Sequence, residues 1–577
     1  MGQNGSGPNG NKNKGPWCIA LVGPFQSGKT TLLEAILSRT GAVQRQGTVD
    51  AGTSVGDASK EARSHKMSVE ASVATTTFMV DSYTFIDCPG SIEFIHDIRA
   101  TLPAVDAAVV VCEADEKKVP QLQLILRELE DLNIPHFLFL NKIDKADKRV
   151  RETLQLLQPA SRVPLLLRQI PIWNDDLIAG FVDLALERAH VYKEHTASEV
   201  IELKGEDLDR EKEARFTMLE TLADHDDELM EQLLEDIQPP RDKVFDDLAK
   251  ELRDRIVCPV LLGCAMRSNG VLRLLKALRH EAPGVAETAE RLGVKPSAEA
   301  VALVLKTFHT THGGKMSVAR VLTGQIGDGT TLSTPDGEAG RVSGGLKPMG
   351  QQFEKRGAAG AGDTVALGKL DGVKTGATLS TGKQPHPALA DVKPSPPVLA
   401  IAVQARERKD DVKLGVAFTK LTEEDPSLVV VHNPENHDVV IWGQGEMHLR
   451  VATERLADRF AVPVSTRPPT VGYRETIRKD VSVRGRHKKQ SGGHGQFGDV
   501  VVEIKHRPRG AGFTFEDRIT GGVVPRNYIP AVEEGVLDGL KHGPLGFPVV
   551  DLTVALVDGS YHTVDSSDQA FRTAGRI

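Results

Sequence analysis

The stretch GPFQSGKTT, Gly23 to Thr31, decides the fold of the N-terminal part of this chain. It follows a short apolar run, WCIALV at residues 17–22, which reads as a buried strand. Apolar residues then recur at helical spacing until Gly41, namely Leu32, Leu33, Ile36 and Leu37. A glycine-rich loop between a strand and a helix is a P-loop, whose backbone N–H groups and helix N-terminus bind phosphate.

The P-loop pattern assigns a role to each of its residues. Lys29 can reach the β and γ phosphates of a nucleotide and is a candidate catalytic cation, and the Thr30 hydroxyl can bind Mg²⁺. The predicted phosphate-binding residues of this loop are Gly23, Pro24, Phe25, Gln26, Ser27, Gly28, Lys29, Thr30 and Thr31.

Three later motifs, each at the end of an apolar run, indicate that the nucleotide is GTP or GDP. In TFIDCPG, residues 84–90, Asp87 can hold the magnesium shell and the Gly90 amide can meet the γ-phosphate. HFLFL leads into the NKID motif, whose Asp144 can accept two hydrogen bonds from guanine and would be left unpaired by adenine. VCPVLL precedes the third motif, which can offer a backbone amide to guanine O6. The predicted guanine-binding residues are Asn141, Lys142, Asp144, Cys264 and Ala265.

Composition excludes several other classes of protein. The chain has 577 residues, enough for several domains, and it is 40% hydrophobic and 26% charged, as is typical of globular proteins. It has no long apolar run or signal peptide, so we expect a cytoplasmic protein without membrane contact. The five cysteines are odd in number and widely spaced, which favours buried thiols over disulfides or metal ligands.

Charge is distributed unevenly along the chain. Residues 202–251 contain 18 Asp/Glu against 7 Lys/Arg, in a pattern that suits helices with one buried face. Met218, Leu222, Met230, Leu233, Leu234 and Ile237 would form that face. Residues 474–509 reverse the balance, with 10 Lys/Arg against 4 Asp/Glu, and are a candidate contact for phosphate backbones.

Beyond the nucleotide motifs, the sequence resembles the translational GTPases, and specifically the elongation factor G family. QIPI and FVDL resemble the start of that family's insert in the GTPase domain, and VALVLKTFHTTHGGKMSVARVLTG resembles its second-domain β-barrel. LTEEDPSL and WGQGEMHL are close to the third-domain signatures. YRETI, QSGGHGQFG, GFPVVDL and DGSYHTVDSSDQAFRTAG resemble the fourth domain.

The resemblance implies a multidomain α/β fold: a P-loop GTPase domain with a helical insert, a β-barrel second domain, then two smaller α+β domains. We expect a disordered tail at 1–16, although MGQNGS also fits a loose N-myristoylation pattern. The expected domains are the GTPase domain at 17–292, its insert at about 160–255, the barrel at 298–390, domain III at 395–474 and domain IV at 475–577. The chain ends within the expected last helix of domain IV, so domain V is absent, and a fragment is favoured over a variant lacking that domain.

The resemblance also implies partners. The ribosome is the main one, through its RNA, through a stalk protein that the acidic insert faces, and through tRNA and mRNA near the decoding site. The chain would act as a monomer. The residues expected to contact RNA are Lys488, Lys489, Gly492, Gly493, His494 and His562.

The departures from the family pattern gather where hydrolysis would take place. Ser91 stands where the family has the histidine that positions the attacking water, and a hydroxyl cannot act as an imidazole. The family's Arg-Gly-Ile-Thr-Ile appears as HKMSV, residues 65–69, in which Ser68 can still offer Mg²⁺ a hydroxyl. The resemblance therefore implies GTP and magnesium binding but leaves efficient hydrolysis open.

Two classes of function follow from this pattern. One is a ribosome-dependent GTPase that promotes translocation or, as in some paralogues, ribosome disassembly and recycling. The other is a GTP-sensing ribosome-binding protein with weak hydrolysis, which Ser91 and HKMSV favour. The enzyme is preferred because much of the stabilisation of phosphoryl transfer is electrostatic, and the ribosome could supply part of it.

Overall fold

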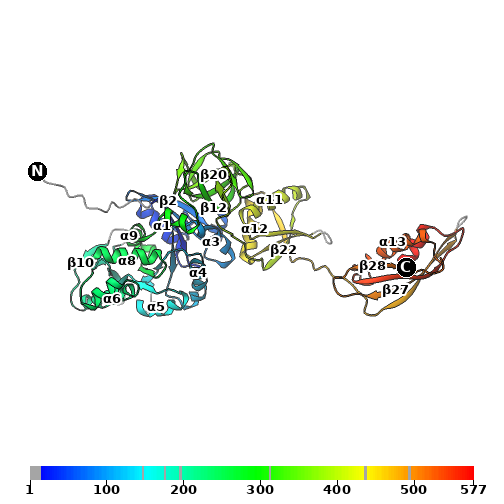
Figure 1. Cartoon of the computed structure of the whole chain (residues 1–577), viewed down its shortest axis with the longest axis horizontal. Coiled ribbons are helices and arrows are strands. Elements are labelled where there is room, and N and C mark those ends of the chain that lie inside the picture. The colour runs from blue at the N-terminus through cyan, green and yellow to red at the C-terminus, as the bar shows by residue number, and fades with distance from the viewer. Residues whose placement is uncertain are drawn as a thin grey trace. The chain divides into compact units, whose positions relative to one another are not determined.

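The structure, a computed structural model, describes residues 15–145, 149–174, 177–193, 198–310, 314–433, 438–490 and 495–577 (Figure 1). The predicted RNA contacts Gly492, Gly493 and His494, and most of the expected N-terminal tail, lie outside these residues. The chain forms two compact units that divide between Pro468 and Pro469, whereas the sequence predicts a domain boundary at 474/475.

The first unit is built on a parallel sheet whose strands are buried on both faces. Its order is β2-β3-β1-β4-β5-β11-β6, and only β2 runs antiparallel to its neighbour. The strands are β1 (Trp17–Val22), β2 (Ser72–Phe78), β3 (Asp81–Asp87), β4 (Ala107–Cys112), β5 (His136–Leu140), β6 (Leu165–Leu167) and β11 (Cys258–Leu262). Alternate residues of β1 enter two separate cores, Cys18 and Ala20 on one face and Ile19 and Leu21 on the other.

Helices cover both faces of this sheet. They are α1 (Lys29–Arg39), α3 (Ile95–Thr101), α4 (Val119–Asp131), α5 (Val150–Leu157) and α9 (Val271–Glu281), whereas α2 (Lys60–His65) and α10 (Val285–Arg291) pack on later parts of the chain. The P-loop, Asp87-x-x-Gly90, NKID and Gly263-Cys264-Ala265 follow β1, β3, β5 and β11. Because these strands are parallel, all four motifs lie at the carboxyl edge of one sheet, where ligands of such folds bind.

The acidic insert contains a sheet as well as the expected helices. The sheet has the antiparallel order β10-β9-β8-β7, formed by β7 (Gln169–Asn174), β8 (Leu177–Asp183), β9 (Arg188–Val191) and β10 (Glu199–Ile201). The helices are α6 (Glu206–Ala223), α7 (Asp227–Leu234) and α8 (Arg241–Arg253). Met218 and Leu222 are buried as predicted, but Leu234 and Ile237 are 80% and 50% exposed. The prediction that these two belong to the buried face is therefore wrong: Leu234, the last residue of α7, faces solvent while its neighbour Leu233 packs against the core, and Ile237 lies beyond the helix.

The first unit continues into a β-rich domain and a smaller α+β domain. The β-rich domain contains β12 (Val301–Thr310), β13 (Gly314–Thr323), β14 (Gln325–Ile326), β15 (Thr331–Thr334), β16 (Gly337–Arg341), β17 (Gly345–Met349), β18 (Gln352–Arg356), β19 (Ala359–Gly360), β20 (Thr364–Gly368) and β21 (Thr378–Ser380). The α+β domain has the sheet order β23-β24-β22-β25 and two helices. It comprises β22 (Leu399–Ala405), α11 (Asp411–Glu424), β23 (Val429–His432), β24 (Val439–Gly443), α12 (Glu446–Asp458) and β25 (Val464–Arg467).

The second unit is a four-stranded sheet, order β26-β27-β29-β28, that shares a core with two helices. Its elements are β26 (Val481–Gln490), β27 (Gly495–His506), β28 (Phe513–Asp517), α13 (Ile529–Leu540), β29 (Leu552–Ser560) and α14 (Asp568–Arg576). Val500 and Val554 of the sheet pack with Val532 of α13 and Phe571 of α14. The helices belong to this core, so the opposite face of the sheet carries polar side chains.

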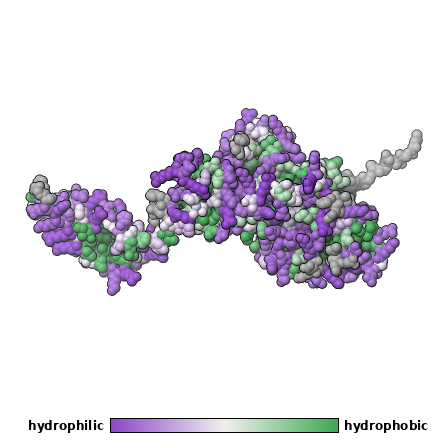
Figure 2. Space-filling view, turned by 180° about the vertical axis from the view of Figure 1, so that it is seen from behind, coloured by the Kyte–Doolittle hydropathy of each residue, from purple (hydrophilic) through white to green (hydrophobic). Residues whose placement is uncertain are grey.

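The face seen in Figure 2 is predominantly hydrophilic, with smaller apolar patches. Within the described residues, no helix is both long enough and apolar enough to span a bilayer. All five cysteines are buried and unpaired, as the sequence predicts.

Candidate nucleotide site

The P-loop has the backbone that a phosphate cradle requires. Gly28 has φ 99°, and a Cβ there would lie 2.4 Å from Asn141 Nδ2, so only glycine fits. Lys29 Nζ donates to the carbonyl oxygens of Gly23 and Pro24, each at 3.0 Å. Burial lowers the pKa of Lys29 to about 8. The ammonium is therefore held at the mouth of the loop, where a bound phosphate can replace the two carbonyl oxygens as its hydrogen-bond acceptor.

Oxygen ligands gather beside the P-loop at the predicted magnesium position. Thr30 Oγ1 donates to Asp87 Oδ2 at 2.6 Å and lies 3.1 Å from Ser68 Oγ. Asp87 is fully buried, and its Oδ1 has no hydrogen-bond partner among the described residues. Burial, together with the negative charge of Asp57, raises the pKa of Asp87 to about 7. Hydroxyl and carboxylate oxygens are ligands that Mg²⁺ prefers, so the three predicted metal-binding residues, Thr30, Ser68 and Asp87, fit the ion.

Asp57 also belongs to this site, although the sequence reasoning missed it. Its side chain is buried and lines the same cavity as Thr30 and Ser68, and burial raises its pKa. Asp57 lies in GDASKE, directly before α2, where one carboxylate in a polar stretch carries no distinctive pattern. Its distance along the chain from Ser68 and Asp87 hid the cluster that the fold assembles.

At the guanine end, Asn141 joins two of the motifs and Asp144 is left incompletely paired. Asn141 Nδ2 donates to Ser27 O and its Oδ1 accepts from the Ala265 N–H, both at 2.9 Å. Lys142 Nζ lies 2.8 Å from both Gln26 O and Glu113 Oε2, which holds it along the P-loop. Within the described part of the chain, Asp144 Oδ1 is buried without a hydrogen-bond partner. A buried acceptor of this kind is what the N–H donors of guanine would satisfy.

The two predicted guanine-reading amides already have partners inside the protein. Ala265 N–H bonds Asn141, and Cys264 N–H donates to Asn269 O at 3.1 Å. Readout of guanine O6 through this loop therefore stays a prediction, and it requires the Ala265 amide to share or exchange its acceptor.

A cavity of about 220 Å³ lies against the P-loop, and its lining does not include Asp87, Asp144 or Ala265. It is lined by Phe25, Gln26, Gly28, Lys29, Thr30, Thr31, Val49, Asp57, Lys66, Met67, Ser68, Gly90 and Lys142. Ser91 is not among these lining residues. Its Oγ instead accepts from the Glu93 N–H at 3.4 Å and begins the short 3-10 helix η1 (Ile92–Phe94). Gln121 of α4 bridges the loops from behind, bonded to Phe25 N at 3.1 Å and to Gly90 O.

The segments on either side of this cavity pack against α12. On the α2 side, His65 Nε2 lies 2.9 Å from Glu454, and Glu70 is paired with Arg455, Arg459 and Lys306 at 3.0–3.3 Å. These cations hold the pKa of the Glu70 carboxyl far below its usual range despite burial. On the η1 side, Glu93 Oε2 accepts from the His448 N–H in the first turn of α12 at 2.8 Å. The elements that would sense the nucleotide are therefore tied to one helix of another domain.

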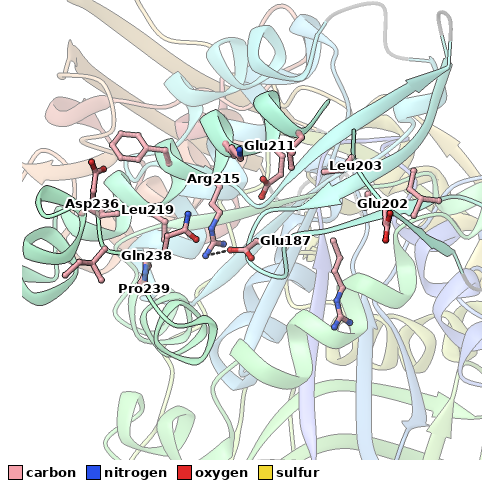
Figure 3. Close-up of a pocket in the computed structure, with 17 residues that line it drawn as sticks. Glu187, Glu202, Leu203, Glu211, Arg215, Leu219, Asp236, Gln238 and Pro239 are labelled. Atoms are coloured by element: carbon pink, nitrogen blue, oxygen red, sulfur yellow. Dashed lines mark ion pairs between the residues drawn. The ribbon is translucent and has the colours of Figure 1, made fainter. Parts of the chain in front are cut away.

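A second, larger cavity lies on the insert (Figure 3). Its volume is about 770 Å³, and apolar side chains of α6 and its surroundings line it, including Leu203, Leu208, Phe216 and Leu219. The charged lining is mixed, and Arg215 is paired with Glu187 at 2.7 Å. Its acidic residues are Glu187, Glu202, Glu211 and Asp236, and its basic residues are Arg188, Lys212 and Arg215. Glu211 is 5% exposed, its Oε1 has no hydrogen-bond partner in the described chain, and burial raises its pKa. The groove thus combines an apolar floor with an unsatisfied buried carboxyl.

In the second unit, the predicted arm residues Lys488, Lys489 and His562 are exposed. Lys488 pairs across the ladder with Phe497, while Lys489 points to the opposite face because side chains alternate along a strand. The Arg486 guanidinium lies 5.6 Å from the centre of the Phe497 ring, and the His562 ring is 6.4 Å from it. Arg486 and Phe497 were not among the RNA contacts predicted from the sequence. A basic and an aromatic residue on either side of the glycine-rich hairpin are a pattern that could have indicated them.

Comparison with known proteins decides the family. The model of the elongation factor Tu GTP-binding domain matches residues 17–284, that of elongation factor G domain III matches 394–468, and that of domain IV matches 469–577. An elongation factor G-like protein of Synechocystis sp. is 44% identical over 562 residues, covering 97% of this chain and 83% of its own length. The chain belongs to the elongation factor G family.

A solved structure agrees with this assignment. A crystal structure of a protein from Thermus thermophilus is 33% identical, with a TM-score of 0.83 over 97% of this chain and 83% of that one. The predicted fold class of this elongation factor G relative, a multidomain α/β protein with a GTPase domain, is therefore confirmed, and a GTP-binding domain implies GTP and GDP as its ligands.

Proposed function

We propose that this chain is a ribosome-dependent GTPase that binds GTP with Mg²⁺ and promotes a movement of the translating ribosome, with translocation of tRNA and mRNA as the first candidate. The observation that carries the proposal is the gathering of four GTPase motifs at the carboxyl edge of one sheet, where Asp87 and Asp144 each keep a buried carboxylate oxygen without a hydrogen-bond partner among the described residues. A ribosome partner implies action in the cytoplasm.

The residues present would divide the work as follows. Lys29 and the P-loop amides would hold the phosphates, while Thr30, Ser68 and Asp87, with Asp57 behind them, would hold Mg²⁺. The ion would neutralise charge on the phosphates. Asp144 would accept from guanine, and Asn141 would keep the P-loop and the Ala265 loop in register.

The experiment is GTP turnover with and without ribosomes. We expect turnover to be low alone and to rise with ribosomes. If ribosomes do not raise it although GTP binds, the enzyme proposal is wrong and the alternative stands, a GTP-sensing ribosome-binding protein with weak hydrolysis. The turning of Ser91 toward Glu93, and its absence from the cavity lining, favour that alternative. A role in ribosome disassembly would appear as subunit splitting in the same preparation.

Ser91→His separates the two functions. A water-orienting side chain contributes about 10²–10⁴-fold in rate, so the variant should turn over GTP faster on ribosomes with its GTP affinity unchanged. Ser297→His serves as the matched control, because Ser297 is exposed, lies outside the cavity lining and, like Ser91, accepts a hydrogen bond from the N–H two residues further on. Equal rates for wild type and Ser91→His would mean that another group orients the water.

We also propose that the groove on the insert binds the ribosomal stalk protein, as the family resemblance implies. Its apolar floor complements the apolar face of an amphipathic segment, one basic side chain of which would pair with the buried Glu211. In a titration of stalk protein against the full chain, Phe216→Ser should weaken binding by about 10-fold, since an apolar anchor contributes about 1–2 kcal/mol. Val412→Ser, an exposed apolar residue of α11, should not. Unchanged binding by Phe216→Ser would rule out this groove.

A further inference from the structure

Lys66 is the one residue of the HKMSV segment that brings a positive charge to the nucleotide cavity. It follows α2, and its N–H closes that helix on Ala62 O. Its backbone is left-handed, with φ 51° and ψ 41°, a region that favours glycine. The family pattern has glycine at this position. A lysine therefore occupies a conformation that disfavours it, at the edge of a ligand cavity, and strain of this kind gathers at functional sites.

The neighbours of Lys66 locate it at the phosphate end of the cavity. Ser68, two residues further on, has its hydroxyl 3.1 Å from Thr30 Oγ1, and Lys66 shares the cavity lining with Lys29 and Gly90. The Lys66 ammonium lies 3.8 Å from Asp50, with the two side chains 63% and 87% exposed. An exposed pair at this distance is weak and can be exchanged for a phosphate.

The other cations that line the cavity are already held by the protein. Lys29 Nζ bonds two P-loop carbonyls, and Lys142 Nζ bonds Gln26 O and Glu113. Lys66 comes from a different segment, the one that carries Ser68 and packs on α12.

We propose that Lys66 contacts the γ-phosphate of bound GTP, so that it makes this chain prefer GTP to GDP. This inference rests on the proposed function, because it takes GTP as the ligand of the cavity. The contact would also order the HKMSV segment when the third phosphate is present, because the lysine would bridge that phosphate and the C-terminus of α2.

The test is equilibrium binding of GDP and of a non-hydrolysable GTP analogue, with Mg²⁺, to the full chain. Lys66→Gly should lower the GTP-to-GDP affinity ratio by about 10-fold, the size expected for one partly exposed charge pair. Lys66→Arg, which keeps the charge, should retain the ratio. Lys295→Ala removes an exposed lysine that lies outside both α2 and the cavity lining, so it should also retain the ratio.

Each outcome is decisive. An unchanged ratio in Lys66→Gly, or an equal loss of GTP and GDP affinity, would overturn the γ-phosphate contact while leaving the proposed function intact. Wild-type protein that binds neither nucleotide would overturn both. The melting temperature of Lys66→Gly without nucleotide should not fall, because glycine accepts the left-handed backbone, and this excludes misfolding as the cause of a changed ratio.

Discussion

Asp144 is the residue on which base specificity depends. Its buried, unpaired Oδ1 matches a guanine N–H donor. An asparagine N–H₂ group at this position would instead place a donor opposite that guanine donor. We expect Asp144→Asn to weaken GTP binding by roughly 1–3 kcal/mol and to improve xanthosine triphosphate relative to GTP. Competition binding with both nucleotides measures this, with the exposed Asp131→Asn as control. Tight binding of ATP by wild type would contradict the assignment.

Asp87 predicts how stability depends on pH. Its pKa is raised to about 7 in the folded chain, first by burial and then by Asp57, against about 3.9 in an unfolded chain. A raised carboxyl pKa contributes stability at low pH that is lost as the pH rises toward the folded value. Without Mg²⁺, Asp87→Asn should therefore be more stable than wild type at pH 8, by roughly 1–3 kcal/mol, and the gain should shrink by pH 5.

Urea unfolding at the two pH values measures the effect, and the exposed Asp558→Asn is the control. Adding Mg²⁺ to the GDP-bound protein should stabilise wild type more than Asp87→Asn, because the variant lacks a metal ligand. A variant that is less stable than wild type at pH 8 would show that the Thr30 hydrogen bond outweighs the repulsion.

Local patterns predicted most of the residues at this site, and the fold supplied the rest. Lys29, Thr30 and Asp87 were predictable because each sits at a fixed offset from a strand end, where short-range geometry determines the role. Asp57 and Gln121 were not, because their roles come from long-range contacts across the sheet edge. Strands buried on both faces were predictable as apolar runs, whereas the sheet of the insert was mistaken for part of a helical region because the acidic helices beside it dominate its composition.

At the scale of elements, η1 and α12 are joined by a carboxylate from outside the helix. Glu93 accepts the His448 N–H, one of the amides that the first turn of α12 cannot satisfy internally. Its charge also lies at the positive end of the helix dipole. We expect Glu93→Gln to lower the free energy of unfolding by about 1 kcal/mol, measured in guanidinium at low salt.

The matched control is Glu446→Gln, which removes a charge from the first turn of the same helix, at a side chain that has no hydrogen bond to η1 among the described residues. Its effect should be only a few tenths of that of Glu93→Gln. Equal effects would mean that the dipole, and not the contact between domains, accounts for the loss.

At the scale of the whole molecule, ribosome binding should depend on the second unit and on salt. Replacing Lys488 and Lys489 with alanine should flatten the dependence of ribosome affinity on salt, because each phosphate contact adds about 0.7–0.9 to the logarithmic slope. Lys488→Ala should account for more of the change than Lys489→Ala, because Lys488 shares its face with Phe497 and Arg486. The affinity is measured by co-sedimentation at several salt concentrations.

His562→Ala in the same assay should weaken ribosome binding and leave GTP affinity unchanged, since His562 belongs to the unit that lacks the nucleotide motifs. Salt-insensitive binding by wild type would remove the RNA contact from this face. Loss of GTP affinity in His562→Ala would mean that the two units communicate.

The contacts that α2 and η1 make with α12 form a clasp. Any coupling between this clasp and GTP binding must act in both directions. If GTP strengthens this clasp by some factor, then anything that strengthens the clasp must tighten GTP by the same factor, because the two routes around the thermodynamic cycle have equal free energy. A partner that bound α12 and held it against Glu70 and Glu93 would slow dissociation of the nucleotide without contacting the nucleotide itself. One that pulled α12 away would act as an exchange factor working from a distance.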